Sequence, residues 1–250
     1  MKLESLLQYL SEYLRLDEFP DYPLAFNGLQ VEGPDTVSRI CAAVDSSEAV
    51  IEEAVRRGAD LLIVHHGLFW DGRHRVTGPR YRKLHKLLTK GLAVFSAHLP
   101  LDAHPEVGNC AILARELGLD ALERFGTYAG EEIGWCGTLD TDREAFREKI
   151  AGVVDGPVRL IPGGPGQLHR IAVVTGGAAS MISEAATAGI DALVTGEGAH
   201  HTFHQAMELG VNAYYAGHYA TETWGVKALA AHIQERFEIP WEFIDAPTGL

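Results

Sequence analysis

The sequence has few cysteines and no long hydrophobic run. Its three cysteines, Cys41, Cys110 and Cys136, are odd in number and lie far apart, so they match neither a disulfide framework nor a zinc-type spacing. No apolar segment reaches the roughly 20 residues of a membrane span, and residues 1–16 place leucines at helical spacing instead of forming a signal core. These absences predict a cytoplasmic protein that makes no membrane contact.

Basic residues are also scarce. The chain has 21 lysines and arginines against 34 acidic residues, a formal net charge of −13. Such a surface repels polyanions, and the basic runs are short, for example residues 73–75 and 80–86. Duplex DNA is therefore not expected as the main partner.

Aliphatic runs alternate with amphipathic segments along the chain. The predicted strands are residues 39–45, 60–65, 92–98, 132–139, 156–161, 169–175, 191–195, 211–217 and 241–244. The predicted helices are residues 2–16, 46–57, 79–90, 107–118, 141–151, 179–188, 201–209 and 220–236. This alternation predicts an α/β fold with largely parallel strands.

Two parts of the chain match each other at a constant offset. Residues 40–67 align without a gap with residues 171–198, at an offset of 131. Further along, His98–Asp102 and His218–Glu222 share the pattern His-x-x-x-carboxylate at an offset of 120. Each half therefore reads as strand, helix, strand with a polar end, helix, and strand followed by histidine and carboxylate.

The repeat predicts the organisation of the fold. We expect two interlinked three-layer α/β/α halves related by internal duplication. The first half would span residues 1–125, completed by residues 220–250, and the second half residues 126–219. The alternative is a chance resemblance between two generic strand–helix–strand units.

The aliphatic run Leu61–Val64 ends in two adjacent histidines, His65 and His66. Ligands in open α/β sheets gather beyond the carboxyl ends of such buried strands. Successive side chains of a strand point in different directions, so both imidazoles serve one site only if they bind different ions or different faces of it. The pair thus predicts a two-metal centre, against the alternative of one packed and one solvated histidine.

Two further strand ends carry the same chemistry. Pro100 is expected to keep the segment after His98 non-helical, which places Asp102 in a loop, whereas Glu222 is expected in the first helical turn after His218. Imidazole and carboxylate without thiolate suit zinc, iron, manganese, nickel or cobalt. Taken alone, a carboxylate at either of these positions is usually a helix cap or a partner of the helix dipole, and only the combination favours a metal site.

Four motifs, in this order, resemble the YbgI-type proteins, also called the GTP cyclohydrolase I type 2 or NGG-interacting-factor-three-like family. The motifs are Asn27–Gly33, His65–Trp70, His98–Asp102 and Gly217–Glu222. The resemblance implies a dinuclear metal centre with two divalent ions per subunit. Its implied ligands are His65, His66, Asp102, His218 and Glu222, with His98 beside the metals as the candidate catalytic residue.

The resemblance also implies an assembly. Members of this family form a toroidal homohexamer with sites facing an inner cavity, and this chain has the length of the compact form without an inserted domain. Asn27 and Gln30 are expected either to line the site or to bond loop backbone.

Two functions follow as hypotheses. The first is a metal-dependent hydrolase acting on a small molecule, a nucleotide-like or cyclic amide substrate, with His98 as proton shuttle or oxyanion partner; the family name implies a GTP cyclohydrolase-type activity. The alternative is a non-catalytic metal-containing ring that binds single-stranded nucleic acid, a partner protein or the metal itself. Purely structural metals are a third reading.

Overall fold

The computed structural model describes residues 1–70, 72 and 74–250, so Arg73 of the first basic run lies outside the described residues. The chain divides into two compact units. Unit 1 comprises Met1–Leu101 and Gly225–Ala246, and unit 2 comprises Asp102–Trp224 and Pro247–Leu250. The sequence placed the first boundary at residue 125, whereas this division falls at Leu101.

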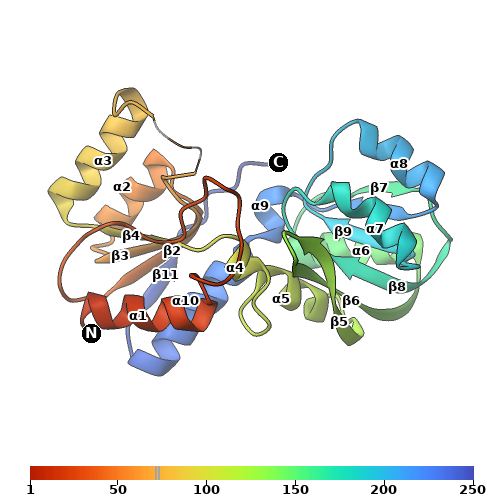
Figure 1. The fold of residues 1–250 in the computed structure, drawn as a ribbon, viewed down its shortest axis with the longest axis horizontal. Coiled ribbons are helices and arrows are strands. Elements are labelled where there is room, and N and C mark those ends of the chain that lie inside the picture. Colours follow the sequence, from red (N-terminus) through yellow and green to blue (C-terminus); the bar gives the residue numbers. More distant parts are fainter. Residues whose placement is uncertain (71, 73) are drawn as a thin grey trace. The chain divides into compact units, whose positions relative to one another are not determined.

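Unit 1 contains a five-stranded sheet in the order β1-β4-β3-β2-β11 (Figure 1). The strands are β1 (Gly28–Val31), β4 (Ala93–Ser96), β3 (Leu61–His66), β2 (Ile40–Asp45) and β11 (Trp241–Phe243). β4, β3, β2 and β11 run parallel, and β1 is antiparallel to β4. The central strands β2 and β3 are short, buried and mostly aliphatic, as expected for strands covered on both faces.

Helices cover both faces of this sheet. They are α1 (Leu3–Leu14), α2 (Glu48–Arg56), α3 (Gly78–Lys90) and α10 (Thr223–Phe237). Ile51 of α2 and Leu87 of α3 pack in one core with Leu62 and Val94 of the sheet. Strand side chains alternate between faces, so the buried Ile63 belongs to the opposite face, where α1 and α10 lie (Figure 1). Unit 1 is thus a three-layer α/β/α unit.

Unit 2 contains a six-stranded sheet in the order β5-β6-β8-β9-β10-β7. The strands are β5 (Asp120–Tyr128), β6 (Glu131–Asp142), β8 (Gln167–Val173), β9 (Ala192–Thr195), β10 (Asn212–Tyr215) and β7 (Arg159–Pro162). Only β8, β9 and β10 pair in parallel, and the other pairings are antiparallel.

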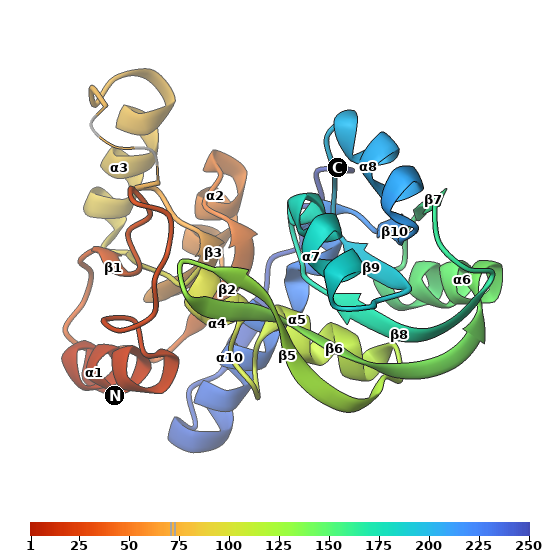
Figure 2. The same cartoon turned by 45° about the vertical axis from the view of Figure 1, so that its right-hand side comes forward.

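The prediction of largely parallel strands is therefore wrong for this sheet. A long hairpin of β5 and β6 extends it (Figure 2). Its two-residue turn, Ala129–Gly130, has φ values of 50° and 93°, the backbone that a tight hairpin requires. Alanine is uncommon at such a turn, so the local sequence does not mark the hairpin.

The helices of unit 2 are α5 (Asn109–Glu116), α6 (Arg143–Val154), α7 (Ile182–Thr187), α8 (His201–Leu209) and the single turn α9 (His218–Thr221). A 3₁₀ turn, Ala179–Met181, precedes α7. Leu113 of α5 and Phe146 of α6 share one core with Val194 and Tyr214 of the sheet. α7 and α8 lie on the other face (Figure 2).

The internal repeat extends to the register of the strands. β2 and β3 pair with Ile40 opposite Leu61, and β8 and β9 pair with Ile171 opposite Ala192, which is the same register at the offset of 131. Both units therefore contain the duplicated strand–helix–strand element that the sequence indicates.

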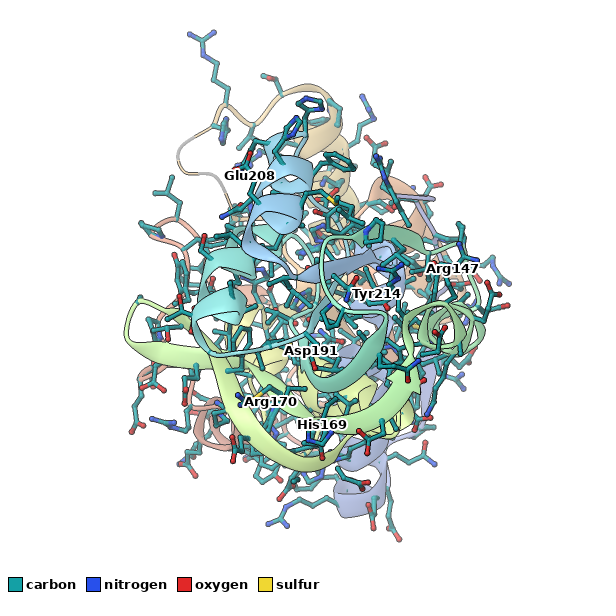
Figure 3. The ribbon with its side chains drawn as sticks, turned by 90° about the vertical axis from the view of Figure 1, so that its right-hand side faces the viewer. Arg147, His169, Arg170, Asp191, Glu208 and Tyr214 are labelled. Atoms are coloured by element: carbon teal, nitrogen blue, oxygen red, sulfur yellow. The ribbon has the colours of Figure 1, made fainter. Side chains whose placement is uncertain are left out.

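An aspartate repeats with the strands. Asp60 Oδ2 accepts a hydrogen bond from Arg39 N (3.1 Å), and Asp191 Oδ2 accepts one from Arg170 N (2.9 Å). Figure 3 labels Asp191 and Arg170 of the second copy. The duplicated aspartates tie the start of each central strand to the strand beside it.

One residue distinguishes the third strands of the two copies. His98 follows Ser96 by two residues, whereas His218 follows the equivalent Tyr215 by three. Gly217 lies in the longer segment with φ at 92°, a backbone conformation that favours glycine. The extra residue changes the offset from 119 at Ser96 and Tyr215 to 120 at the two histidines, and the larger drop from 131 lies in the connections between the second and third strands of each copy.

Among the described residues, no helix is both long enough and apolar enough to cross a membrane.

Candidate metal centre

Three histidines gather where β3 and β4 of unit 1 end. His65 and His66 are the last residues of β3, and His98 follows β4. One ring nitrogen from each of the three lies within 4.8 Å of the others. His65 and His98 are buried and His66 is half-buried, so the sheet brings together both members of the His-His pair and the predicted catalytic histidine.

The two adjacent histidines each have Nδ1 against an oxygen. His65 Nδ1 lies 2.9 Å from the carbonyl oxygen of Ala97, and His66 Nδ1 lies 2.9 Å from Asp45 Oδ1. A neutral imidazole that donates from Nδ1 has its lone pair on Nε2, the arrangement typical of metal-binding histidines. Asp45 ends β2, next to β3, so neighbouring strands supply both histidine and carboxylate.

His98 belongs to a buried polar network. Its Nδ1 lies 2.8 Å from Asp21 Oδ1, and its backbone N donates to Asn27 Oδ1 at 2.8 Å. Asn27 Nδ2 and Leu99 N donate to Asp21 Oδ2 at 2.8 and 3.1 Å. Burial acts to raise the pKa of Asp21, but the hydrogen bond and charge of His98 and the bond from Asn27 outweigh it and hold that pKa below its ordinary value.

Gln30 holds the loop that follows the histidine pair. Its Oε1 accepts from Leu68 N at 2.5 Å and Phe69 N at 3.3 Å, and its Nε2 donates to Phe26 O at 2.6 Å. A Cβ on Gly67 would overlap the Gln30 side chain. Of the two expected roles, Gln30 has the structural one. Asn27 accepts a hydrogen bond from the backbone N of His98 and donates one to Asp21, the carboxylate that contacts the His98 ring.

Aromatic rings surround the histidines. The Trp70 ring lies edge to face with His98, with centroids 4.2 Å apart, and 5.5 Å from His66. The Tyr22 ring is 5.3 Å from His98 and 5.9 Å from Trp70. Unit 1 therefore presents its three imidazoles beside two large aromatic side chains.

Asp102 begins unit 2 and is buried. It ends a single-turn helix, α4 (Leu99–Asp102), so the prediction that Pro100 keeps this segment non-helical is wrong. Proline is tolerated in a first turn because its missing N–H has no helical partner there. Asp102 Oδ1 accepts hydrogen bonds from Asn109 Nδ2 (2.9 Å) and Thr175 Oγ1 (3.0 Å).

His218 and Glu222 form the second part of the unit 2 cluster. His218 Nε2 lies 3.1 Å from Glu222 Oε1, and His218 Nδ1 lies 2.8 Å from Glu197 Oε1. The bond to Glu222 raises the pKa of His218, and with Glu197 it outweighs the opposing effect of burial, bringing the pKa to about 9. Glu222 is buried, and one of its oxygens lies within 4.8 Å of an Asp102 oxygen.

Glu222 differs from its predicted position. It follows α9 and directly precedes α10, so it lies between two helices instead of in the first turn of one. Gly176, with φ at 66°, approaches it so closely that a Cβ there would lie 2.3 Å from Glu222 Oε1. The backbone of the Gly176 turn therefore forms one wall around this carboxylate.

Five side chains that orient four of the six predicted residues were not among the predicted site residues. These are Asp21, Asp45, Asn109, Thr175 and Glu197. Two of them carry a signal: Asp45 ends an aliphatic strand, and Glu197 occupies the position of His66 in the second copy of the repeat. Asp21 and Asn109 come from a loop and a helix start whose local sequence indicates no contact with a ligand, whereas Thr175 begins a Thr-Gly-Gly segment before a helix, a pattern that can bind an anion.

The residues fit a divalent metal. Each unit offers imidazole nitrogen, carboxylate oxygen or both from buried or half-buried side chains, and nitrogen–oxygen sets of this kind bind first-row divalent ions. In all four histidines Nδ1 contacts a carbonyl or carboxylate oxygen. These His, Asp and Glu groups can hold a metal ion.

Comparison with known proteins decides the family. The family described as Duf34/NIF3 (NGG1p interacting factor 3) matches residues 1–248. This chain belongs to the Duf34/NIF3 family. The family resemblance that the four sequence motifs indicate is thereby confirmed.

Two Duf34/NIF3 relatives carry the name GTP cyclohydrolase 1 type 2 homolog. The protein of Deinococcus radiodurans is 46% identical over 250 residues, covering 99% of this chain and 94% of that protein. The protein of Escherichia coli K12 is 40% identical over 253 residues, covering 99% of each.

Solved structures share the fold. A protein from Thermus thermophilus matches with a TM-score of 0.92 at 41% identity, and protein ybgI, described as of unknown function, with 0.93 at 38% identity; each comparison covers 100% of both chains. Reduced HcgD from Methanocaldococcus jannaschii matches with a TM-score of 0.86 at 25% identity, over 98% of each chain. The α/β fold with two sheets is therefore the fold of this family.

Proposed function

We propose that this Duf34/NIF3 protein is a metal-dependent hydrolase with a dinuclear centre. The proposed ligands are His65, His66, Asp102, His218 and Glu222. The observation that carries this proposal is the shared orientation of the histidines, each with Nδ1 against an oxygen. Such contacts position imidazoles to bind metal through Nε2 and raise their basicity.

The five proposed ligands lie on both sides of the division of the chain into units. Only three residues separate His98 of unit 1 from Asp102 of unit 2 along the chain. The internal repeat supports this choice of ligands, because each copy carries its polar residues after the carboxyl ends of its parallel strands.

When bound, two divalent ions supply Lewis-acid polarisation and lower the pKa of a water ligand from about 15.7 to about 7. We assign the proton transfer to His98. Asp21 holds its Nδ1 and stabilises the charged form of the ring, so Nε2 is the atom that accepts or donates the proton. The backbone bond to Asn27 keeps His98 in register with that carboxylate.

The proposed substrate is a nucleotide-like or cyclic amide compound. Trp70 and Tyr22 support this choice, because aromatic side chains beside a reaction site stack on planar rings. The names of the relatives make GTP the first compound to test. A homohexameric ring in the cytoplasm also stays a prediction, and sedimentation would test it against the 27.2 kDa mass of one chain.

The decisive experiment measures metal content and turnover together. The protein is loaded with each candidate divalent ion, its metals are counted, and single-turnover reactions are run with GTP and a panel of nucleotides and cyclic amides. We expect two ions per chain and hydrolysis of at least one compound. Glu222→Ala should lose metal and turnover, whereas Glu208→Ala, which removes an exposed carboxylate of α8 (Figure 3), should keep both.

Two results would contradict the proposal. Turnover that survives Glu222→Ala would remove the metal centre from the reaction. A protein with two bound ions and no turnover across the panel would favour the non-catalytic binding protein.

A further inference from the structure

A pocket of about 330 Å³ lies beside the loop that follows His66 in unit 1. Its volume is within the range of about 300–1,000 Å³ that small-molecule sites occupy. Its lining residues come from that loop and the first turns of α3: Leu68, Phe69, His74, Thr77, Pro79, Arg80, Lys83 and Leu84.

The charge of this lining is opposite to that of the protein. Among the residues that the structure describes, the lining contains an arginine, a lysine and a histidine but no carboxylate, in a chain whose net charge is −13. The nearby acidic residues of α2 pair with other cations of α3: Glu48 with Arg82 and Glu52 with Lys86. The described lining residues therefore give this pocket a positive character on an acidic protein.

The two cations of the pocket are held in place. The Arg80 guanidinium lies over the Phe69 ring, 5.9 Å from its centroid, and Arg80 Nη2 donates to Leu68 O at 3.4 Å. Lys83 Nζ donates to Ser46 O at 3.2 Å, which uses one of the three donors of an ammonium group. Burial and then the charge of Arg80 lower the pKa of Lys83 and outweigh the opposing charge of Glu48, so a bound anion would relieve the repulsion between these cations.

The start of α3 adds to the preference for an anion. This helix of 13 residues begins at Gly78, and Thr77 and Pro79 beside that end line the pocket. Helix N-termini present backbone N–H groups and a positive dipole end to anions. Arginine and lysine together with a helix start are the groups that proteins use to bind phosphate.

The pocket is connected to the candidate metal ligands. Leu68 and Phe69 follow His66 by two and three residues. Ser46, which accepts the Lys83 bond, donates from its own N to His66 O at 3.1 Å. A ligand bound in the pocket would therefore contact the same loop and strand end that position His66.

We propose that this pocket binds the phosphate group of the molecule that reacts at the metal centre, which makes the substrate a phosphate ester. The proposal rests on the proposed function for the reacting part of that molecule. Arg80 and Lys83 bind and orient the phosphate, and they take no part in bond cleavage.

The test is a calorimetric titration of the metal-loaded full chain with inorganic phosphate. The variant Arg80→Gln/Lys83→Gln should bind phosphate at least tenfold more weakly. The matched control, Arg82→Gln/Lys86→Gln, removes the same charge from the same helix outside the pocket and should stay within twofold. Arg80→Lys keeps the charge but loses the planar fork, so it should give an intermediate affinity if the double variant folds poorly.

Two results would overturn the phosphate site. Equal effects of the two double variants, or no effect of either, would show that specific contacts in the pocket do not bind phosphate. Phosphate affinity that disappears with Glu222→Ala but persists in Arg80→Gln/Lys83→Gln would place the anion on the metals.

The same variants separate this site from the proposed function. If a phosphate ester is hydrolysed, its KM should rise at least tenfold in Arg80→Gln/Lys83→Gln with kcat within threefold of the parent. If no compound is hydrolysed while phosphate binding still depends on Arg80 and Lys83, the hydrolase proposal fails and the phosphate site stands.

Discussion

Glu197 Oε1 lies 2.8 Å from His218 Nδ1, and Glu197 occupies in the second copy of the repeat the position that His66 holds in the first. The duplicated strand end thus carries a histidine in one copy and the carboxylate partner of a histidine in the other. Duplication supplied the same framework twice, and the residues at its polar ends have diverged into different roles.

Replacing Glu197 tests whether it orients a metal ligand. Glu197→Ala should weaken metal binding about 10–100-fold, because the loss of an outer carboxylate leaves the imidazole less basic and less well oriented. Competition with a chromophoric chelator measures the change. The matched control is Asp140→Ala, because Asp140 of β6 lies 2.7 Å from Nδ1 of His169 of β8 in an exposed pair that includes no candidate ligand. Equal losses of metal affinity in the two variants would show that Glu197 does not orient His218 for metal binding.

Metal binding should depend on pH through His218. In the metal-free protein the pKa of His218 is raised to about 9, so the ring is protonated at neutral pH and must lose its proton to bind an ion. The apparent affinity should rise by up to about tenfold per pH unit and level off above about pH 9. Chelator competition at several pH values measures this slope. An affinity that is flat between pH 6.5 and 8.5 would contradict it.

Gly176→Ala should disturb the site through Glu222. The added Cβ would lie 2.3 Å from Glu222 Oε1, and the φ of 66° adds strain of about 1–3 kcal/mol. We expect lower stability in chemical unfolding together with loss of metal. Gly58→Ala is the matched control, because Gly58 has φ at 69° and nothing within 4 Å of an added Cβ. It should lose stability alone, and metal loss in both variants would refute the argument.

Asp21→Asn tests the support of His98. The folded pKa of Asp21 lies below its ordinary value of 3.8, so the carboxylate stabilises the fold above that pH and loses this effect as the pH falls through the lowered value. The variant should lose about 1–3 kcal/mol of unfolding free energy at pH 7, and the difference should shrink at acidic pH. Denaturant titrations at pH 7 and pH 3 measure it.

The same variant has a functional outcome. If His98 transfers a proton, Asp21→Asn should lower kcat about 10²–10⁴-fold at unchanged metal content. Asp17→Asn, at an exposed position, is the control. Unchanged turnover in Asp21→Asn would remove His98 from the proton transfer.

The local sequence pattern was enough to predict most helices and strands, but it did not predict how the strands pair. The aliphatic runs at Leu61–Val64 and Ala192–Thr195 mark buried parallel strands because strands covered on both faces need apolar side chains throughout. β1 and β5 escaped prediction, since their half-buried residues follow no clear periodicity. Their place in the sheets depends on hydrogen bonds to strands far along the chain.

The sequence by itself determined the family, the duplicated strand–helix–strand framework and the histidines and carboxylates after the strand ends. These features follow from short-range periodicity and motif spacing. Only the tertiary structure decided which side chains orient them: Asp21 reaches His98 across 77 residues, and Thr175 reaches Asp102 across 73. Such contacts depend on how distant segments pack, because a buried polar atom takes whatever partner the fold brings within hydrogen-bonding distance.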